Sequence, residues 1–258
     1  MLNIAIISHD IVWGDKEENL LLIGEKLRNI KPEVDIVVLP EMFSTGFIQD
    51  GNMIASLAEP SSGKTLEFIK QQAKKYNFAI CGSFIASIAD KYYNRAFFIE
   101  PSGDETFYDK HHLFSIGQEK QAFQAGESKY PIIRYRGWNI ALSICYDIRF
   151  PVWCRNSNLE YDIMIIPANW PDSRAFAWEH LLIARAIENQ AYIIGANRSG
   201  SDDNGKYSQK SYTFDFYGHN AIKHTENNIM YAQLSHQALD DARQKFPVWK
   251  DADKFILL

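Results

Sequence analysis

Three polar residues stand at the ends of apolar stretches in this chain of 258 residues, and their types suggest covalent chemistry. Glu41 follows DIVVLP, Lys110 follows TFYD, and Cys145 follows IALSI. In open α/β sheets, sites form at the carboxyl ends of strands, where side chains point into a crevice. A carboxylate, an ammonium group and a thiol placed in this way can meet without interrupting a core.

The chemistry of the three groups is complementary. A free thiol titrates near about 8.5, so a nearby cation such as Lys110 is needed to favour the thiolate. The same ammonium can donate to the oxyanion of a tetrahedral intermediate, and the backbone N–H of Tyr146 is the expected second donor. Glu41 can take the thiol proton and return it to a leaving amine. We therefore expect Cys145 to react quickly with iodoacetamide, with a pH midpoint below that of a free thiol.

Each residue taken singly also has an ordinary structural explanation. A lone cysteine at a strand end is usually a small buried hydrophobe, and Cys81 and Cys154 are interpreted in this way, Cys154 on the helix expected after Cys145. A lone lysine at a strand edge is usually solvated, and a glutamate after a proline is often the first acid of a helix. Spacing alone leaves open whether the three residues meet.

The surrounding sequence predicts the elements that would position them. Hydrophobic residues make up 46% of the chain, no linker or repeat divides it, and one domain over residues 1–258 is expected. Short β-branched apolar runs alternate with charged segments of helical period, which predicts two sheets faced with helices, a four-layer α/β sandwich. The expected strands lie at 2–9, 35–42, 78–86, 92–101, 106–113, 131–147, 161–169, 191–199, 211–218 and 228–236.

Helices and turns are predicted from caps and turn residues. The expected helices lie at 17–30, 64–77, 173–190 and 236–246, with a further helix beginning near Asp147 or Pro151. Ser173 is the expected N-cap of the third of these helices. The sequence RGWN at 136–139 indicates a hairpin turn.

Charge and composition limit the classes of binding partner and the cellular compartment that we expect. The net charge is −5 without long runs of one sign, so no footprint for nucleic acid or an anionic membrane is expected. Three irregularly spaced cysteines favour a reducing compartment, and the first residues read as a strand rather than a signal peptide. The location expected is cytoplasmic. His111 and His112 have no partner at metal-ligand spacing, so no metal site is expected.

Three stretches resemble the signature blocks of a known superfamily. VVLPEMFSTGF (37–47), YDKHHLF (108–114) and SICYDIRFP (143–151) are similar, in order and separation, to those of the nitrilase/amidase, or carbon–nitrogen hydrolase, superfamily. The resemblance covers nearly the whole chain and is strongest to the ω-amidase branch, whose members hydrolyse the terminal amide of α-keto acid amides. Residues 165–198 also follow the pattern of that branch.

The resemblance implies roles for four residues. Glu41 would be the general base, Lys110 the lysine that stabilises the oxyanion, and Cys145 the nucleophile. A second glutamate, which holds the lysine and helps to place the substrate, is assigned to Glu119 because it lies seven residues before Gly126. Glu127 is the alternative.

The resemblance further implies an αββα fold, a homodimer, and no metal or organic cofactor. The implied substrate is a small linear amide that bears a carboxylate, such as α-ketoglutaramate or α-ketosuccinamate, released as acid and ammonia through a cysteine thioester. Arg174 is the candidate for holding that carboxylate. Asp147 and Arg149 are expected to fix the turn after Cys145 rather than touch substrate. Aromatic walls of the pocket are expected from Phe43, Phe47, Tyr146, Phe150 and Trp170.

Other functions remain open from the sequence. The same Glu, Lys and Cys would serve a hydrolase of neutral amides, N-carbamoyl compounds or nitriles. A Mg²⁺-dependent phosphodiesterase can have similar layers and a metal-binding glutamate after a strand, but SDDN at 201–204 and GHN at 218–220 lack the context it needs. A non-catalytic scaffold would not explain why a glutamate, a lysine and a cysteine stand together at three strand ends.

Overall fold

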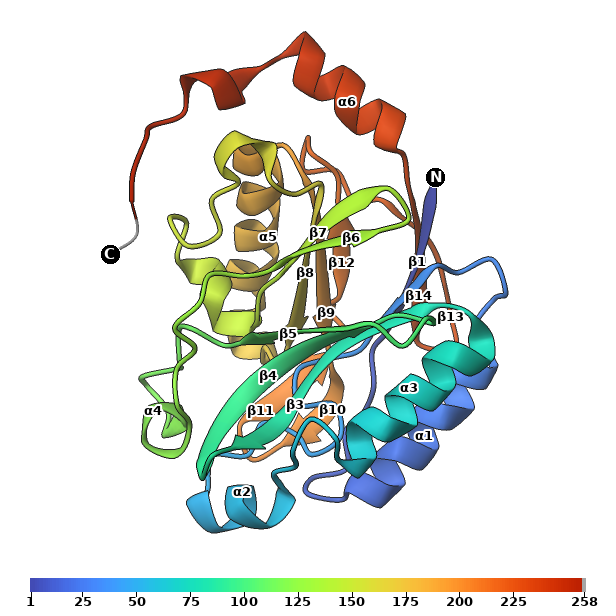
Figure 1. Cartoon of the computed structure of the whole chain (residues 1–258), viewed down its shortest axis with the longest axis vertical. Coiled ribbons are helices and arrows are strands. Elements are labelled where there is room, and N and C mark those ends of the chain that lie inside the picture. The colour runs from blue at the N-terminus through green and yellow to red at the C-terminus, as the bar shows by residue number, and fades with distance from the viewer. Residues whose placement is uncertain (257–258) are drawn as a thin grey trace.

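Fourteen strands and six α-helices are formed in the part of the chain that the structure, a computed structural model, describes, residues 1–256. A seven-stranded sheet has the order β13-β14-β1-β2-β3-β4-β5, and a five-stranded sheet has the order β12-β9-β8-β7-β6. Strands β10 and β11 form a separate hairpin (Figure 1). The bounds of the strands are β1 Leu2–Ile7, β2 Ile36–Val38, β3 Ala79–Ile88, β4 Lys91–Ile99, β5 Glu105–Asp109, β6 Ile132–Tyr135, β7 Trp138–Leu142, β8 Ile163–Ala168, β9 Tyr192–Asn197, β10 Ser199–Asp202, β11 Gly205–Ser208, β12 Tyr212–Phe214, β13 Ile222–Glu226 and β14 Ile229–Leu234.

The centre of each sheet is parallel and its edges are antiparallel. Strand β2 pairs in parallel with β1 and β3, and β8 pairs in parallel with β7 and β9. Parallel strands buried on both faces read as continuous apolar runs, as IVV of β2 and IMIIPA of β8 do. Because these central strands run in parallel, their carboxyl ends lie on the same side of each sheet.

Side chains along β1 and β2 point alternately to the two faces of the sheet, and this alternation shows how the layers form. Ile4, Ile6 and Val38 pack into the core shared by the two sheets, whereas Ala5 and Val37 pack into a second core under helices. Successive side chains of a strand point to opposite faces, so one apolar run fills both cores.

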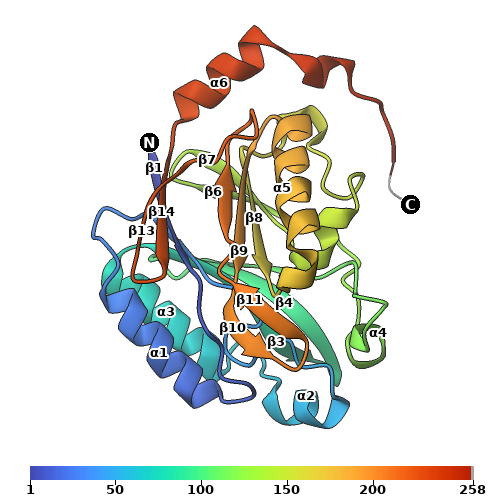
Figure 2. The same ribbon diagram turned by 180° about the vertical axis from the view of Figure 1, so that it is seen from behind.

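The helices cover the outer faces of both sheets. Helices α1 and α3 lie side by side on the seven-stranded sheet, and α5 packs on the five-stranded sheet at the opposite side of the molecule (Figures 1 and 2). This order of helices, sheet, sheet and helix confirms the predicted four-layer sandwich. The bounds of the helices are α1 Lys16–Arg28, α2 Gly51–Leu57, α3 Lys64–Tyr76, α4 Glu119–Ala122, α5 Ala175–Asn189 and α6 His236–Lys245.

Several local predictions were wrong. The chain after Cys145 forms a 3₁₀ helix, η1 (Cys145–Arg149), followed by turns, so Cys154 does not lie on an α-helix. Helix α5 begins after a short 3₁₀ turn, η3 (Asp172–Arg174), with Arg174 at its N-cap and no side-chain cap, so Ser173 does not cap it. Helices α2 and α4, the β10–β11 hairpin and strand β13 were not predicted.

The predicted hairpin turn at RGWN is confirmed. Tyr135 pairs with Trp138 across a two-residue turn, and both central residues, Arg136 and Gly137, have positive φ. The C-terminal segment after α6 descends beside the five-stranded half in Figure 1, where its 3₁₀ turn η4 (Val248–Asp251) lies against η2 (Ser157–Leu159). No helix within residues 1–256 combines the length and the apolar character that a membrane crossing requires.

Candidate active site

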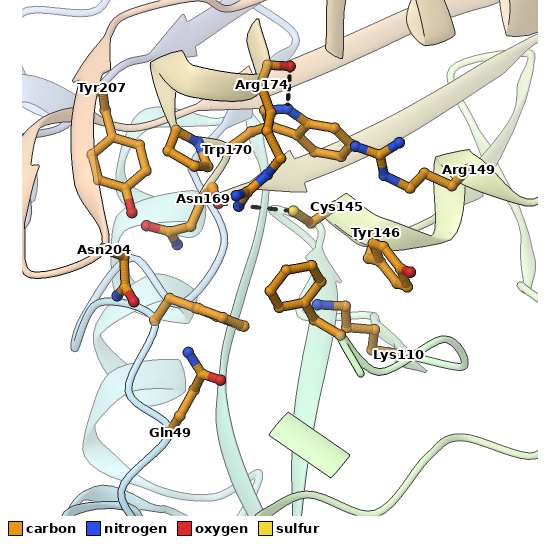
Figure 3. Close-up of a pocket in the computed structure, with 13 residues that line it drawn as sticks. Gln49, Lys110, Cys145, Tyr146, Arg149, Asn169, Trp170, Arg174, Asn204 and Tyr207 are labelled. Carbon is orange, nitrogen blue, oxygen red and sulfur yellow. Dashed lines mark hydrogen bonds between the residues drawn. The ribbon is translucent and has the colours of Figure 1, made fainter. Parts of the chain in front are cut away.

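Four polar residues meet where strands of both sheets end. Glu41 lies just after β2, and Lys110 follows β5, both in the seven-stranded sheet. Cys145 begins η1 after β7 of the five-stranded sheet, and Glu119 begins α4. Lys110 and Cys145 line one pocket, which Figure 3 shows in close-up.

Cys145 occupies a sharp backbone turn. Its φ of 41° lies in the left-handed region, which is unfavourable for a residue other than glycine. Strand β7 has already ended at Leu142, and this turn lets the thiol project into the pocket. Its Sγ lies 4.0 Å from the carbonyl oxygen of Asn169, and the residue is 8% exposed.

Lys110 is held between two glutamates in the interior. Its Nζ donates to Glu41 Oε1 at 2.9 Å and to both carboxylate oxygens of Glu119 at 2.9 and 3.1 Å. All three side chains are at most 1% exposed. The structure therefore brings Glu119, rather than Glu127, to the lysine, because Glu127 is exposed and borders a separate surface groove.

The pKa shifts follow from this burial. Burial lowers the pKa of Lys110, but the charges of Glu119 and Glu41 outweigh it and the net shift is upward. Burial raises the pKa of Glu119, with Glu41 adding to the rise and Lys110 opposing it. The pKa of the Cys145 thiol is raised well above its ordinary value, by burial first and then by Glu41, against the lowering effect of Lys110. This direction is opposite to the low thiol pKa expected from the sequence.

Three further polar residues orient Glu41, and none of them was predicted from the sequence. Asn94 Nδ2 donates to Glu41 Oε1 at 2.7 Å, and Ser83 Oγ donates to Asn94 Oδ1 at 3.0 Å. The backbone N–H of Asn169 donates to Glu41 Oε2 at 2.8 Å, and its side-chain amide donates to the carbonyl of Glu41. The available signal was a polar residue inside an apolar strand, which needs a buried partner.

The pocket wall contains the aromatic residues expected there, with two exceptions. Phe47, Tyr146 and Trp170 line it, whereas Phe43 lies in the outer core and Phe150 borders the separate surface groove. Lys110 Nζ lies 5.2 Å from the centre of the Phe47 ring, a cation–π distance. The remaining residues around the pocket are Gln49, Lys110, Phe114, Cys145, Arg149, Asn169, Pro171, Arg174, Asn204 and Tyr207.

Two arginines face the pocket, one predicted and one not. The guanidinium carbon of Arg149 lies 4.7 Å from the centre of the Trp170 ring, and that of Arg174 lies 5.4 Å from the centre of the Phe114 ring. Arg149, which was expected to fix the turn rather than touch substrate, has its side chain in the pocket wall, because η1 turns it in that direction (Figure 3). Trp170 connects the two, since its indole N–H donates to the carbonyl of Arg174 at 2.8 Å.

Neither guanidinium has a carboxylate within 4.0 Å among residues 1–256, the part that the structure describes. No aspartate or glutamate of that part lines the pocket. The Asn169 Oδ1, a buried acceptor, also has no partner there, so it can accept from a ligand N–H. The pocket thus offers two cations and one acceptor to a small polar molecule.

Cys81, Cys154 and the adjacent pair His111 and His112 have structural surroundings. Cys81 and Cys154 are buried away from the pocket, and burial raises the pKa of both thiols, that of Cys154 to about 12. His111 stacks on Trp153 with ring centres 3.7 Å apart, and His112 donates to Asp147. Asp147 accepts from the N–H of Ile144, as expected for a residue that fixes the turn.

Comparisons with known proteins agree with this geometry. The family model described as carbon–nitrogen hydrolase matches residues 3–244. The chain is 40% identical over 260 residues to omega-amidase YafV of Escherichia coli (strain K12), covering 99% of this chain and 98% of that protein. It is 30% identical over 255 residues to 2-oxoglutaramate amidase of Bacillus subtilis (strain 168), covering 97% of each.

Solved structures agree as well. XC1258 from Xanthomonas campestris, described as a CN-hydrolase superfamily protein with an arsenic adduct in the active site, superposes with a TM-score of 0.94. The two sequences are 35% identical, and the match covers 100% of this chain and 99% of that one. Together with the buried Glu, Lys and Cys at three strand ends, these matches show that the chain belongs to the carbon–nitrogen hydrolase family.

Proposed function

We propose that this enzyme is an ω-amidase that hydrolyses the terminal amide of a small α-keto acid amide, such as α-ketoglutaramate or α-ketosuccinamate, to the acid and ammonia. One observation in particular supports an anionic substrate. Lys110 is neutralised by two glutamates, which leaves Arg149 and Arg174 as pocket cations without an acid partner among residues 1–256. The names of two relatives, omega-amidase and 2-oxoglutaramate amidase, support the same substrate class.

The proposed reaction passes through a thioester on Cys145. The sulfur attacks the amide carbon while the thiol proton passes to Glu41, and Lys110 and the Tyr146 N–H donate to the resulting oxyanion. The raised thiol pKa fits this order, because a protonated thiol needs a base at the moment of attack. The carbon–nitrogen bond then breaks as Glu41 returns the proton to nitrogen, and ammonia leaves.

Water completes the cycle. Glu41 takes a proton from a water molecule that attacks the thioester carbon, and the carbon–sulfur bond breaks with return of the proton to Cys145. Glu119 keeps Lys110 charged and in place through the two hydrogen bonds that its carboxylate accepts from the lysine. Asn169, Asn94 and the lysine fix both oxygens of Glu41, so the carboxylate is aimed before substrate arrives.

The carboxylate of the substrate is proposed to lie between Arg149 and Arg174. Arginine recognises carboxylates with paired N–H donors, and Trp170 holds one arginine by its ring face and the other by its indole N–H. Of the two, Arg149 is the more enclosed side chain, while Arg174 is exposed at the rim. Arg149 is therefore expected to contribute more to binding.

The test is a substrate panel scored by ammonia release. α-Ketoglutaramate, α-ketosuccinamate, neutral aliphatic amides of matched length, N-carbamoyl compounds and nitriles are compared by kcat/KM. Hydrogen bonds to a charged group are worth about 1.5–3 kcal/mol, so the keto acid amides should exceed neutral amides by roughly 10- to 100-fold. Equal or higher values for neutral amides or nitriles would favour those substrates instead.

Arginine variants extend the test to the pocket. Arg149→Met and Arg174→Met should each raise KM for α-ketoglutaramate and leave KM for a neutral amide unchanged, with the larger rise for Arg149. Arg134→Met is the matched control, because Arg134 is exposed on β6 away from the pocket. Equal effects on charged and neutral amides would remove the arginines from substrate recognition.

A further inference from the structure

Asp147 is a fully buried carboxylate two residues after Cys145, and it accepts four hydrogen bonds. Its Oδ2 accepts from the Tyr108 hydroxyl at 2.8 Å and from the N–H of Ile144 at 3.1 Å. Its Oδ1 accepts from the backbone N–H and from Nδ1 of His112, both at 2.9 Å. An ionised carboxylate has acceptor sites for all four donors and no proton to offer any of them.

The positions of these donors matter more than their number. Tyr108 lies two residues before Lys110 and His112 lies two residues after it, so the donors bracket the lysine on both sides. The fourth donor, Ile144, directly precedes Cys145. Asp147 therefore connects the chain on either side of the lysine to the chain on either side of the thiol.

This connection crosses between the two sheets. Lys110 follows β5 of the seven-stranded sheet, whereas Cys145 follows β7 of the five-stranded sheet, and β5 and β7 share no backbone ladder. At the other side of the site, Glu41 and Asn169 link the ends of β2 and β8 in a similar way. The relative position of lysine and thiol thus depends on side-chain contacts between the sheets.

We infer that Asp147 is a positioning residue that sets the distance between Lys110 Nζ and Cys145 Sγ by holding both flanks of the lysine to the turn that carries the thiol. The inference rests on the proposed roles of Lys110 and Cys145. A displacement of about 1 Å at a reacting group can cost on the order of 10²-fold in rate, so a link of this kind affects turnover more than binding.

An amide in place of the carboxylate cannot make the same contacts. Asparagine has one acceptor oxygen and one NH₂ group, so one pair of donors would face another donor. With NH₂ toward Tyr108, that hydroxyl already accepts from the indole N–H of Trp153 and the N–H of His111, so it cannot accept a third bond, and the N–H of Ile144 loses its acceptor. With NH₂ toward His112, the backbone N–H of that residue loses its acceptor. Either way, one backbone contact beside Cys145 or close to Lys110 is broken.

The experiment compares Asp147→Asn with Asp109→Asn. Asp109 is the neighbour of Lys110, and its bidentate ion pair with Arg95 joins β5 to β4 inside one sheet. For Asp147→Asn we expect kcat for the best amide of the panel to fall on the order of 10²-fold with KM unchanged. Asp109→Asn should lower the thermal midpoint and leave kcat close to that of the unchanged chain.

A second readout needs no substrate. Lys110 favours the thiolate of Cys145, so a lysine that has moved away should slow alkylation of Cys145 by iodoacetamide at a fixed pH. Asp147→Asn should show this slower labelling, followed by mass spectrometry of the Cys145 peptide, and Asp109→Asn should not. If the unchanged chain released no ammonia from any amide, the proposed function would fail, while the labelling rates would still test the role of Asp147.

A milder pair of variants applies if Asp147→Asn does not fold. His112→Ala removes the Nδ1 donor together with the ring that stacks on Phe150, and His112→Asn also lacks the ring but returns an amide N–H close to the same place. We expect kcat and labelling to fall in the alanine variant and to recover partly in the asparagine variant. Unchanged kcat and labelling in folded Asp147→Asn, or equal behaviour of the two His112 variants, would overturn the inference.

Discussion

The site works with charges that the protein keeps almost entirely out of water. Two glutamates share Lys110, and the three side chains are at most 1% exposed. Burial of an unpaired ammonium would be costly, but here each of its carboxylate contacts is a charge-assisted hydrogen bond. The upward shift in the pKa of Lys110 means that its charge is retained across the working pH range, so it can stabilise an oxyanion throughout.

The thiol of Cys145, unlike the ammonium of Lys110, is favoured in its neutral form, and this predicts how its alkylation depends on pH. Burial and Glu41 raise its pKa above the ordinary value, so in the free enzyme the neutral thiol is favoured and the thiolate appears only at higher pH. The rate of iodoacetamide labelling at Cys145 should therefore keep rising above pH 9 instead of reaching a plateau near neutrality. The measurement is a pH series of labelling rates by mass spectrometry of the Cys145 peptide.

Cys145→Ala serves as the control for that series, because any remaining slow label would then report Cys81 and Cys154. It should also abolish ammonia release in a chain that stays folded. A labelling midpoint near or below 8.5, the value of a free thiol, would contradict the direction of the shift and favour a preformed thiolate.

The sequence identified Glu41, Lys110 and Cys145 because each stands where an apolar run ends, a pattern that needs no knowledge of distant contacts. Glu119 came from the family resemblance, and the geometry separates it from Glu127 through the contact with Lys110. Asn94, Asn169 and Arg149 were missed for one reason. Their importance depends on which strand ends become neighbours and on how a turn points its side chains, and neither is encoded locally.

At the scale of elements, the turn after β7 shows where local prediction fails. An α-helix was expected there, but the chain forms η1, starting from the positive φ of Cys145. Tertiary contacts explain the outcome, because Asp147 accepts hydrogen bonds from the segment around Lys110 and the N–H of Ile144. The long amphipathic elements, such as α3 and α6, were predicted well since their period of apolar residues decides them.

The loop between α4 and β6 gives a prediction at this scale. The N–H of Gly126 donates to the carbonyl of Lys110 at 2.9 Å, so the loop that follows Glu119 docks directly on the end of β5. A Cβ at this glycine would lie 2.2 Å from the carbonyl oxygen of Asp109, a backbone atom that cannot move alone. Gly126→Ala should therefore push the loop away, lowering kcat and costing about 1–3 kcal/mol of unfolding free energy.

The matched control is Gly51→Ala, at the first residue of α2. A Cβ there meets nothing within 4 Å, so the substitution should be neutral or slightly stabilising. Urea unfolding and ammonia release measure the two effects. If Gly126→Ala were as stable and as active as Gly51→Ala, the loop could not be docked as closely as the structure has it.

At the scale of the whole molecule, the site depends on a fixed position of the two sheets relative to each other. Their shared core supplies most of the contact, from residues such as Ile4 and Val38 on one sheet and Ile140 and Ile165 on the other. Apolar packing resists separation but has little directional preference. Buried polar links then fix the relative placement, as Asp147 and the Glu41–Asn169 pair do beside the pocket.

A further buried link lies far from the pocket and gives the last prediction. Arg243 of α6, the helix that follows β14 of the seven-stranded sheet, reaches into the five-stranded half. It pairs with Asp162 at 2.6 Å and donates to the carbonyls of Tyr161 and Gln190 at 2.8 and 2.9 Å. Arg243→Met keeps the length of the side chain but leaves the charge of Asp162 buried. It should lower the free energy of unfolding by about 3–5 kcal/mol in urea.

A double variant separates the cost of the stranded charge from the loss of the link. Asp162→Asn removes the charge, so adding it to Arg243→Met should restore part of the lost stability rather than increase the loss. Arg134→Met, on the exposed side of β6, is the control for loss of an arginine and should change stability little. If the double variant lost the sum of the two single effects, Arg243 and Asp162 would act independently. Arg243 would then hold α6 through the carbonyls of Tyr161 and Gln190 rather than through Asp162.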